Sequence, residues 1–289
     1  MARNSTGGGR FNRPASKDYS KKDLPKTRMQ LFGAMLRSHI GSLFLLNILY
    51  VVFNLPLWAW MFYNSVAFVT GGSEQFIADG APIIMLAVAI PLIAFTGPAK
   101  AAMKYVLRNW ARDEHASVFT DFVDAFKDNW KQALLFSSVN GVVTFLAGVA
   151  ILFYGSIAAA GNLWGNFLLY FVIVLYLLWC MMNIYIWPMM VTYKMLVRDI
   201  LRNSFVLLLG QLPRTALFGL ITVFPMAFAM IGSLIGLIIV ILYYVIYGMA
   251  ITGFINVSFT NHLFDLYFTP QIVGEVSHRG LYKEEPDGE

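Results

Sequence analysis

Residues 81–114 read APIIMLAVAIPLIAFTGPAKAAMKYVLRNWARDE, and this stretch decides the fold class. Residues 81–96 carry no charged side chain, whereas the second half carries Lys104, Arg108 and Arg112 at four-residue spacing. Side chains spaced by four residues share one face of a helix. An apolar run that ends in a basic helical edge is typical of a transmembrane helix emerging into the cytoplasm.

The composition of the whole chain agrees with this interpretation. Of the 289 residues, 58% are hydrophobic and 13% are charged. Soluble globular domains carry about 25% charged residues. With so few charged side chains the protein has no means of covering its core with a polar surface. The composition therefore excludes an ordinary soluble domain and predicts that most of the surface faces lipid.

The apolar segments predict an all-α, polytopic integral membrane helix bundle of six spans. Four spans are predicted singly, over residues 40–69, 81–108, 133–154 and 164–193. The uncharged stretch 215–264 is too long for one crossing and is predicted to hold two, joined near Gly232 and Ser233. The expected organisation is a disordered basic cytoplasmic tail (1–28), a transmembrane domain (29–267) and a cytoplasmic C-terminal tail (268–289).

The basic residues predict the orientation. All 21 Lys and Arg residues fall into four groups: before the first span, from Lys100 to Lys131, from Lys194 to Arg214, and after the sixth span. In a six-span bundle these groups share one side, and the other side carries Glu74 and Asp79 with no basic residue. Because positively charged loops remain in the cytoplasm, both termini are predicted to be cytoplasmic.

Two prolines are predicted to kink their spans. Pro98, beside the flexible Gly97, and Pro188 each remove a backbone donor from a helix. The basic edge that follows Pro98 recurs after Pro188 as a second set of three residues, Lys194, Arg198 and Arg202. This recurrence indicates either an internal duplication, as transporter folds often contain, or two helices that end independently in cytoplasmic charge.

Residues 117–132, SVFTDFVDAFKDNWKQ, predict a cytoplasmic amphipathic helix that leads into the third span. Ser117 is its expected N-cap. The apolar face has helical spacing and comprises Phe119, Phe122, Val123, Phe126 and Trp130. Such a face either lies in the lipid interface or docks a partner protein.

The predicted spans lack charged residues deep in the membrane, which disfavours a proton-coupled carrier. The polar residues that remain include five asparagines, Asn47, Asn54, Asn140, Asn183 and Asn256. Asparagines within spans usually bond to neighbouring helices, so we expect packing roles for them. A facilitator that uses neutral groups remains open.

No catalytic residue, cofactor site or metal site is predicted, and we do not expect an enzyme. The chain lacks the H-E-x-x-H, G-x-S-x-G and G-x-x-x-x-G-K-[ST] patterns. Its four histidines lack zinc-ligand spacing, and the single cysteine, Cys180, is expected to be a small hydrophobe. No RNA-binding motif accompanies the basic N-terminal segment, so no nucleic-acid partner is predicted.

Three segments carry a family resemblance: NILYVVFNLPLW (47–58), TGPAKAAMKYVLRNWARDE (96–114) and SVFTDFVDAFKDNWKQALLF (117–136). Together they resemble the YesL-like family of bacterial membrane proteins, whose molecular function is unassigned. The resemblance covers roughly residues 30–220 and implies no catalytic residues.

The resemblance implies a location in the bacterial cytoplasmic membrane and an accessory or regulatory role in carbohydrate uptake, beside the permease and ATPase subunits of an ABC importer. The chain does not itself read as such a permease. Gly210, Leu212 and Pro213 match the end of the permease loop, but its Glu-Ala-Ala pattern is missing. The alternative is a passive channel or facilitator for a small polar solute.

Overall fold

The computed structural model describes residues 25–231, 234–268, 270 and 281, and over these residues the fold is all-α. The helices in chain order are α1 (Arg28–Ser38), α2 (Ile40–Gly71), α3 (Ser73–Ala78), α4 (Ala81–Ala111), α5 (Val118–Ala159), α6 (Leu163–Thr192), α7 (Val197–Gly210), α8 (Leu212–Val223), the 3₁₀-helix η2 (Phe224–Ile231), α9 (Leu234–Tyr243), the π-helix η3 (Tyr244–Gly248) and α10 (Met249–Tyr267). Most of both predicted tails lies outside the described residues.

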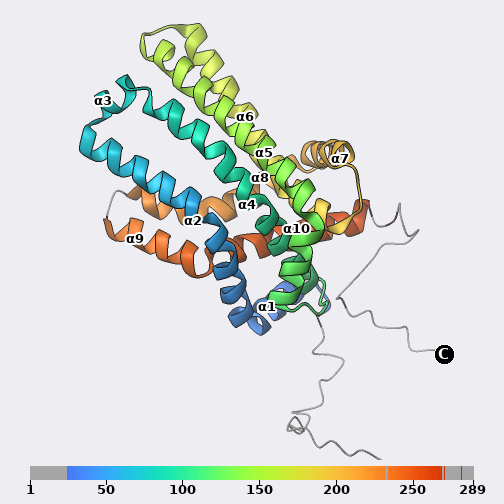
Figure 1. The fold of residues 1–289 in the computed structure, drawn as a ribbon. Coiled ribbons are helices and arrows are strands. Elements are labelled where there is room, and N and C mark those ends of the chain that lie inside the picture. Colours follow the sequence, from blue (N-terminus) through green and yellow to red (C-terminus); the bar gives the residue numbers. More distant parts are fainter. Residues whose placement is uncertain (1–24, 232–233, 269, 271–280, 282–289) are drawn as a thin grey trace, which may run out of the picture.

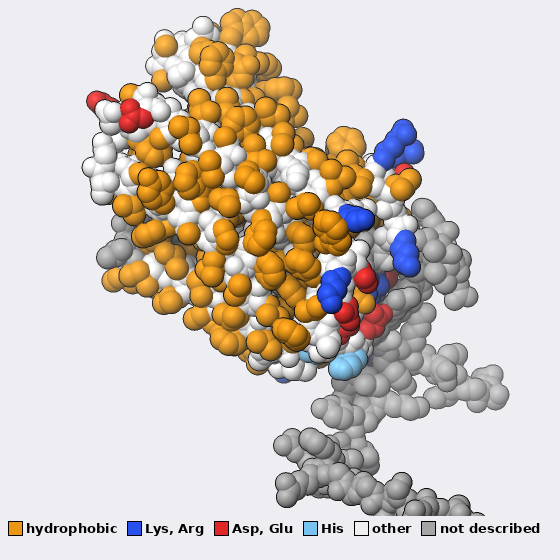
Figure 2. Space-filling view, in the orientation of Figure 1, with side chains coloured by type: hydrophobic (Ala, Val, Ile, Leu, Met, Phe, Trp, Pro, Cys, Tyr) orange, Lys and Arg blue, Asp and Glu red, His pale blue; other side chains and the backbone are white. Residues whose placement is uncertain are grey.

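The long helices run obliquely side by side (Figure 1). Helix α3 and the turn between α5 and α6 lie at one end of the bundle, whereas α1 and α7 lie at the other. Hydrophobic side chains cover most of the visible face, with Lys and Arg gathered near α7 and an acidic group over α3 (Figure 2). Acidic side chains also lie among the Lys and Arg side chains, whereas no Lys or Arg is visible near α3 (Figure 2).

Five helical segments are long and apolar enough to cross a membrane: Ile40–Gly71, Ala81–Ala111, Val118–Ala159, Leu163–Thr192 and Ile235–Tyr267. A further pair, Val197–Gly210 and Leu212–Ala227, passes the same test as one unit but is bent by 97°. The protein is therefore a multi-pass membrane protein, with this bent pair as the candidate for the remaining crossing. The predicted junction at Gly232 and Ser233 lies outside the described residues.

An ion pair joins the two ends of the helical domain. Arg28 Nη2, at the start of α1, lies 2.6 Å from Asp265 Oδ2, near the end of α10. The chain thus begins and finishes its helical domain at the same end of the bundle, which requires an even number of passes. Since the five long segments alone would leave the ends apart, this contact favours six passes.

The predicted amphipathic stretch and the third span form one unbroken helix. Helix α5 has 42 residues, so at 1.5 Å per residue it is about 63 Å long, roughly twice the thickness of a bilayer core. Ser117 is its N-cap, but its hydroxyl makes no capping bond. Instead the Asp121 carboxylate accepts a hydrogen bond of 2.5 Å from the Ser117 N–H, so the predicted hydroxyl cap is wrong.

Small residues allow α4 to pack closely on its neighbours. Ala99, Ala101 and Ala102 are fully buried. At Gly97 an added Cβ would lie 1.8 Å from Ser137 Oγ and 2.6 Å from the Ala133 carbonyl oxygen on α5. Gly97 therefore permits a close helix contact, a role that the prediction of flexibility missed. Helix α4 continues through Pro98 without a break, so the predicted kink there stays a prediction.

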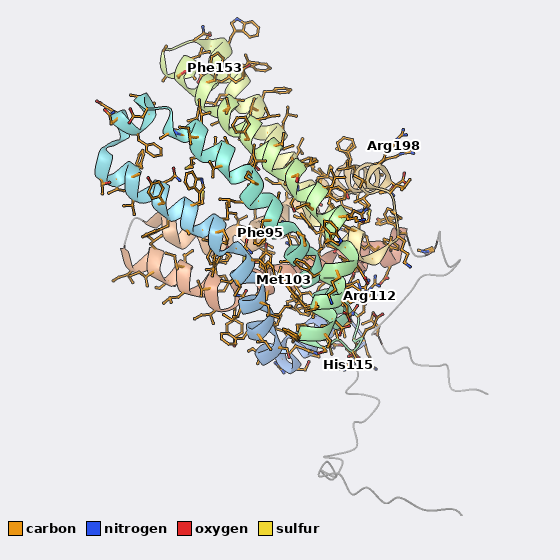
Figure 3. All side chains as sticks on the ribbon, viewed as in Figure 1. Phe95, Met103, Arg112, His115, Phe153 and Arg198 are labelled. Carbon is orange, nitrogen blue, oxygen red and sulfur yellow. The ribbon has the colours of Figure 1, made fainter. Side chains whose placement is uncertain are left out.

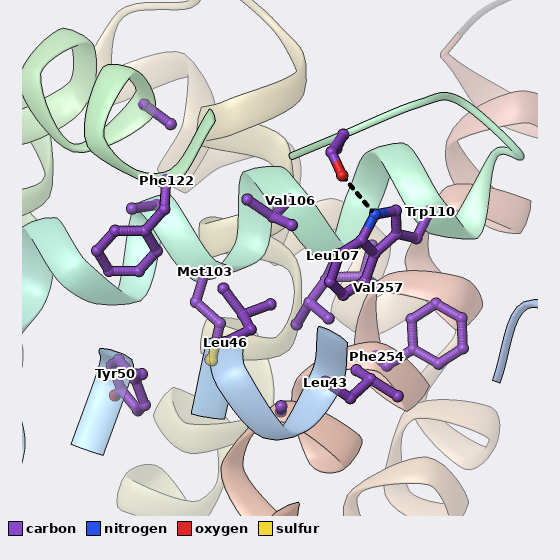
Figure 4. Close-up of a cluster of buried hydrophobic side chains, with 14 of the residues drawn as sticks. Leu43, Leu46, Tyr50, Met103, Val106, Leu107, Trp110, Phe122, Phe254 and Val257 are labelled. Atoms are coloured by element: carbon purple, nitrogen blue, oxygen red, sulfur yellow. Dashed lines mark hydrogen bonds between the residues drawn. The ribbon is translucent and has the colours of Figure 1, made fainter. Parts of the chain in front are cut away.

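The end of α4 packs in a buried hydrophobic cluster with residues of α2, α5 and α10 (Figure 4). Trp110 is almost fully buried, and its Nε1 donates to the Ala116 carbonyl at 3.1 Å. That bond ties the turn after α4 back onto the helix. The cluster fixes the rotation of α4, and with it the direction in which the lysines of α4 point.

Candidate functional site

The basic residues of α4, predicted as a cytoplasmic basic edge, are largely enclosed by neighbouring helices. Lys104 is 5% and Arg112 is 7% exposed. Arg108 is half-buried and donates from Nη1 to the Val191 carbonyl of α6 at 2.5 Å. Helices α6 and α10 pack against this end of α4, so its basic face becomes an inter-helix contact.

The second set of basic residues behaves differently. Lys194, Arg198 and Arg202 are all exposed, and Figure 3 shows Arg198 at the outer edge of the molecule on α7. Helix α6 ends at Thr192, only four residues after the buried Pro188, so Lys194 precedes α7 rather than continuing α6. The two sets share a spacing but not a structural setting, which favours independent helix ends over a duplication.

Lys100 and Lys104 line a cavity of about 480 Å³, here called the lysine cavity, between α4, α6, α8 and α10. The Lys100 Nζ lies 4.6 Å from the centre of the Trp187 ring, which is a cation–π contact. The Lys104 Nζ lies 3.3 Å from the Gly253 carbonyl oxygen of α10. The two residues stand one helical turn apart, so both ammonium groups face the same space.

Neither lysine has an acidic partner within the described part of the chain. The other polar side chains that line the cavity are neutral, namely Cys180, Asn183, Thr222 and Asn256. The charge pattern of the sequence assigns both lysines to the cytoplasmic end of the span. The structure instead turns them into the bundle, where an unpaired cation is costly and is tolerated mainly for function.

Helix α10 shapes one wall of the cavity through a glycine. A Cβ on Gly253 would lie 2.7 Å from Leu107 Cδ1 and 3.6 Å from the Lys104 Nζ. The glycine thus lets the α10 backbone approach α4 and exposes its carbonyl to the lysine. Asn256 follows three residues later, and its Oδ1 is buried without a hydrogen-bond partner among the described residues. The cavity therefore offers two cations and one unused acceptor.

A smaller cavity of about 280 Å³ continues from the lysine cavity and shares Lys100, Cys180, Asn183 and Trp187 with it. Its walls hold a network of inter-helix hydrogen bonds. Asn140 Nδ2 donates to Asn183 Oδ1 at 2.9 Å, and Trp179 Nε1 donates to Asn140 Oδ1 at 2.8 Å. Asn140 and Asn183 thus have the packing role expected of them, but Asn256 departs from that expectation.

The apolar face predicted for residues 117–132 is divided between core and surface. Phe122 is 3% exposed, and the Phe126 ring lies 5.3 Å from that of Phe53 on α2. Val123 is half-buried, whereas Phe119 is 63% and Trp130 is 46% exposed. The five side chains therefore do not form one docking surface, because α2 and α4 already cover its centre.

Residues 43–154 match the family described as "Protein of unknown function, DUF624". This match agrees with the resemblance of the chain to the YesL-like family. No significant match was found among curated proteins or solved structures. The YesL-like segment contains the lysines of α4, whereas the cavity walls from α6, α8 and α10 lie beyond the match.

Sequence reasoning missed the lysine cavity, although one signal was present. Lys100 lies among small residues, with Ala99 before it and Ala101 and Ala102 after it. Alanines that point in several directions around a helix indicate close packing on neighbouring helices, so a lysine among them is enclosed rather than solvated. Chemically, two ammonium groups that line one cavity are suited to an anionic group. No group of potential metal ligands occurs among the residues that the structure describes.

Proposed function

We propose that this protein is a non-catalytic membrane component of a solute-import system and that its lysine cavity binds an anionic solute. The observation that carries the proposal is the pairing of Lys100 and Lys104 on one cavity without a carboxylate partner in the described chain. Two such cations repel each other and are poorly solvated. A carboxylate or phosphate that entered the cavity would supply the missing charge.

The resemblance to the YesL-like family supports a carbohydrate as the solute and an ABC importer as the setting. A carbohydrate that carries a carboxylate or phosphate offers an anion for the two lysines and hydroxyl donors for Asn256. Its anion would meet the lysines, and a hydroxyl would donate to the unused Oδ1 of Asn256. We place the protein in the bacterial cytoplasmic membrane, with the end that holds Arg28 and Asp265 in the cytoplasm, because exposed basic residues such as Arg198 gather there.

Co-purification tests the accessory role. The protein carries a C-terminal tag, native membranes are solubilised in a mild detergent, and the recovered proteins are identified. We expect permease and ATPase subunits in a fixed ratio, both with the native protein and with Lys104→Gln, because the lysine cavity is not proposed as the contact with the importer. Recovery of the protein alone would contradict the accessory role and leave the solute site to be judged separately.

A passive facilitator is the second candidate, and the polar network between α5 and α6 favours it. The hydrogen-bonded Asn140, Asn183 and Trp179 border a cavity that adjoins the lysine cavity, so polar groups follow one another along the bundle. Liposomes that hold only this protein distinguish the candidates. Uptake of labelled glucuronate that Lys104→Gln abolishes would support a facilitator, and uptake no faster than in empty liposomes would reject it.

A further inference from the structure

A second cavity lies near the ion pair of Arg28 and Asp265. It measures about 490 Å³ and is bordered by α1, α8 and α10. We call it the interfacial cavity. Its lining comprises Arg28, Met29, Phe32, Arg214, Phe218, Ile221, Ile255, Ser258, Phe259, His262 and Leu263. It shares no residue with the lysine cavity.

From one end of the interfacial cavity to the other, the lining side chains of both α8 and α10 change from basic to apolar. On α8, Arg214 stands at the start of the helix, and Phe218 and Ile221 follow one and two turns further along. On α10, which runs the opposite way, the order from the chain end inward is His262, Ser258 and Ile255. The third wall adds Arg28 at the start of α1. Basic groups thus gather at one end of the cavity, and the interior beyond them is apolar.

Of the two arginines at the basic end of the interfacial cavity, Arg214 is the one available to a ligand. Arg28 donates to Asp265 at 2.6 Å, so that its charge is balanced within the protein. Arg214 donates from Nη1 to Gln211 Oε1 at 3.2 Å, and no carboxylate pairs with it among the described residues. Ser258 Oγ, one turn from His262, is buried and has no hydrogen-bond partner in the described chain. An unused donor therefore lies between the basic end and the apolar interior.

We propose that the interfacial cavity binds an anionic glycerophospholipid. The order of groups in such a lipid matches the order of the lining. Its phosphate would meet Arg214 and His262, an ester carbonyl would accept from the Ser258 hydroxyl, and an acyl chain would lie against Phe218, Ile221 and Ile255. Basic sites between transmembrane helices at the cytoplasmic side are suited to anionic lipid headgroups. The site is independent of the proposed import function.

Native mass spectrometry of the full-length protein in a mild detergent tests this site. The probes are phosphatidylglycerol and phosphatidylcholine with identical acyl chains. We expect phosphatidylglycerol to bind about tenfold more tightly, because it alone adds an uncompensated negative charge, and Arg214→Gln to remove that preference. Arg202→Gln is the matched control, since Arg202 is an exposed arginine of α7 that does not line the cavity. Ile255→Trp, which fills the apolar part, should weaken binding of both lipids.

Three results would overturn the proposal. Equal binding of the two lipids would remove the headgroup recognition. An equal loss in Arg202→Gln and Arg214→Gln would indicate general surface charge. Displacement of phosphatidylglycerol by millimolar inorganic phosphate, with Ile255→Trp unchanged, would indicate a site for a free anion rather than a lipid. Thermal unfolding of each variant establishes that it is folded, so a loss of binding reports on the site.

Discussion

Asn47 of α2 accepts a hydrogen bond of 2.9 Å from the backbone N–H of Ala250 in α10. Its Nδ2 donates to the carbonyls of Tyr244 and Val245, at 3.1 and 2.7 Å. The two carbonyls belong to the first residues of the π-helix η3, and Ala250 follows shortly after its end, so the contacts span the point where the ordinary helical bonding pattern is interrupted. One buried side chain therefore satisfies the backbone at the point where α9 passes into α10, which is how irregular backbone is tolerated within a membrane.

Replacement of Asn47 by Ala should destabilise the protein by about 2 kcal/mol, because it leaves buried backbone groups without partners. Asn54→Ala is the matched control, since Asn54 donates to the Tyr50 carbonyl within its own helix, at 2.9 Å. Thermal unfolding in detergent measures both. Equal losses of stability would show that Asn47 is not a specific support for the π-helix.

Phe122→Ala should lower the free energy of unfolding by about 3–5 kcal/mol, because Phe122 fills the cluster between α2, α4 and α5. Phe119→Ala, on the same helix but 63% exposed, should change it by no more than about 0.5 kcal/mol. The comparison is made by denaturant unfolding. If the two variants were equally stable and Phe122→Ala instead lost a bound partner, the docking interpretation would be right.

Gly97→Ala should destabilise the protein by about 1–3 kcal/mol, because the new methyl group would collide with Ser137 and with the Ala133 carbonyl. Adding Ser137→Ala should recover part of the loss by removing the nearest atom. Gly155→Ala in α5 provides the control, since nothing lies within 4 Å of the added Cβ there. A neutral Gly97→Ala would mean that α4 and α5 are further apart than described.

Hydropathy and composition predicted the helical class and the first four apolar spans. They did not predict the direction of individual side chains. A count of basic residues near a span end treats Lys104 and Arg198 alike, yet Lys104 is enclosed by α10 and Arg198 faces outward. That difference depends on which helix packs against which, a long-range property that local spacing does not encode. The same reason explains why Phe122 was predicted on a face for lipid or a partner and is instead buried in the bundle.

Cysteine labelling tests the orientation. In a Cys180→Ala background, a membrane-impermeant maleimide applied to intact cells should label Glu74→Cys in α3 and should not label Ser117→Cys at the start of α5. Both native side chains are exposed in the structure, so access to the reagent depends on the side of the membrane. Labelling of Ser117→Cys alone would reverse the proposed orientation.

The most direct test of the central claim is the affinity of the purified protein for solutes that differ in charge. Calorimetric titration in detergent compares glucose, glucuronate and glucose 6-phosphate. We predict that an anionic member of this set binds at least about tenfold more tightly than glucose, and that Lys104→Gln abolishes the difference. Lys131→Gln, at an exposed lysine of α5, should leave it unchanged. Equal affinity for the charged and uncharged sugars, or an anion preference that survives Lys104→Gln, would contradict the assignment of the lysine cavity as an anion site.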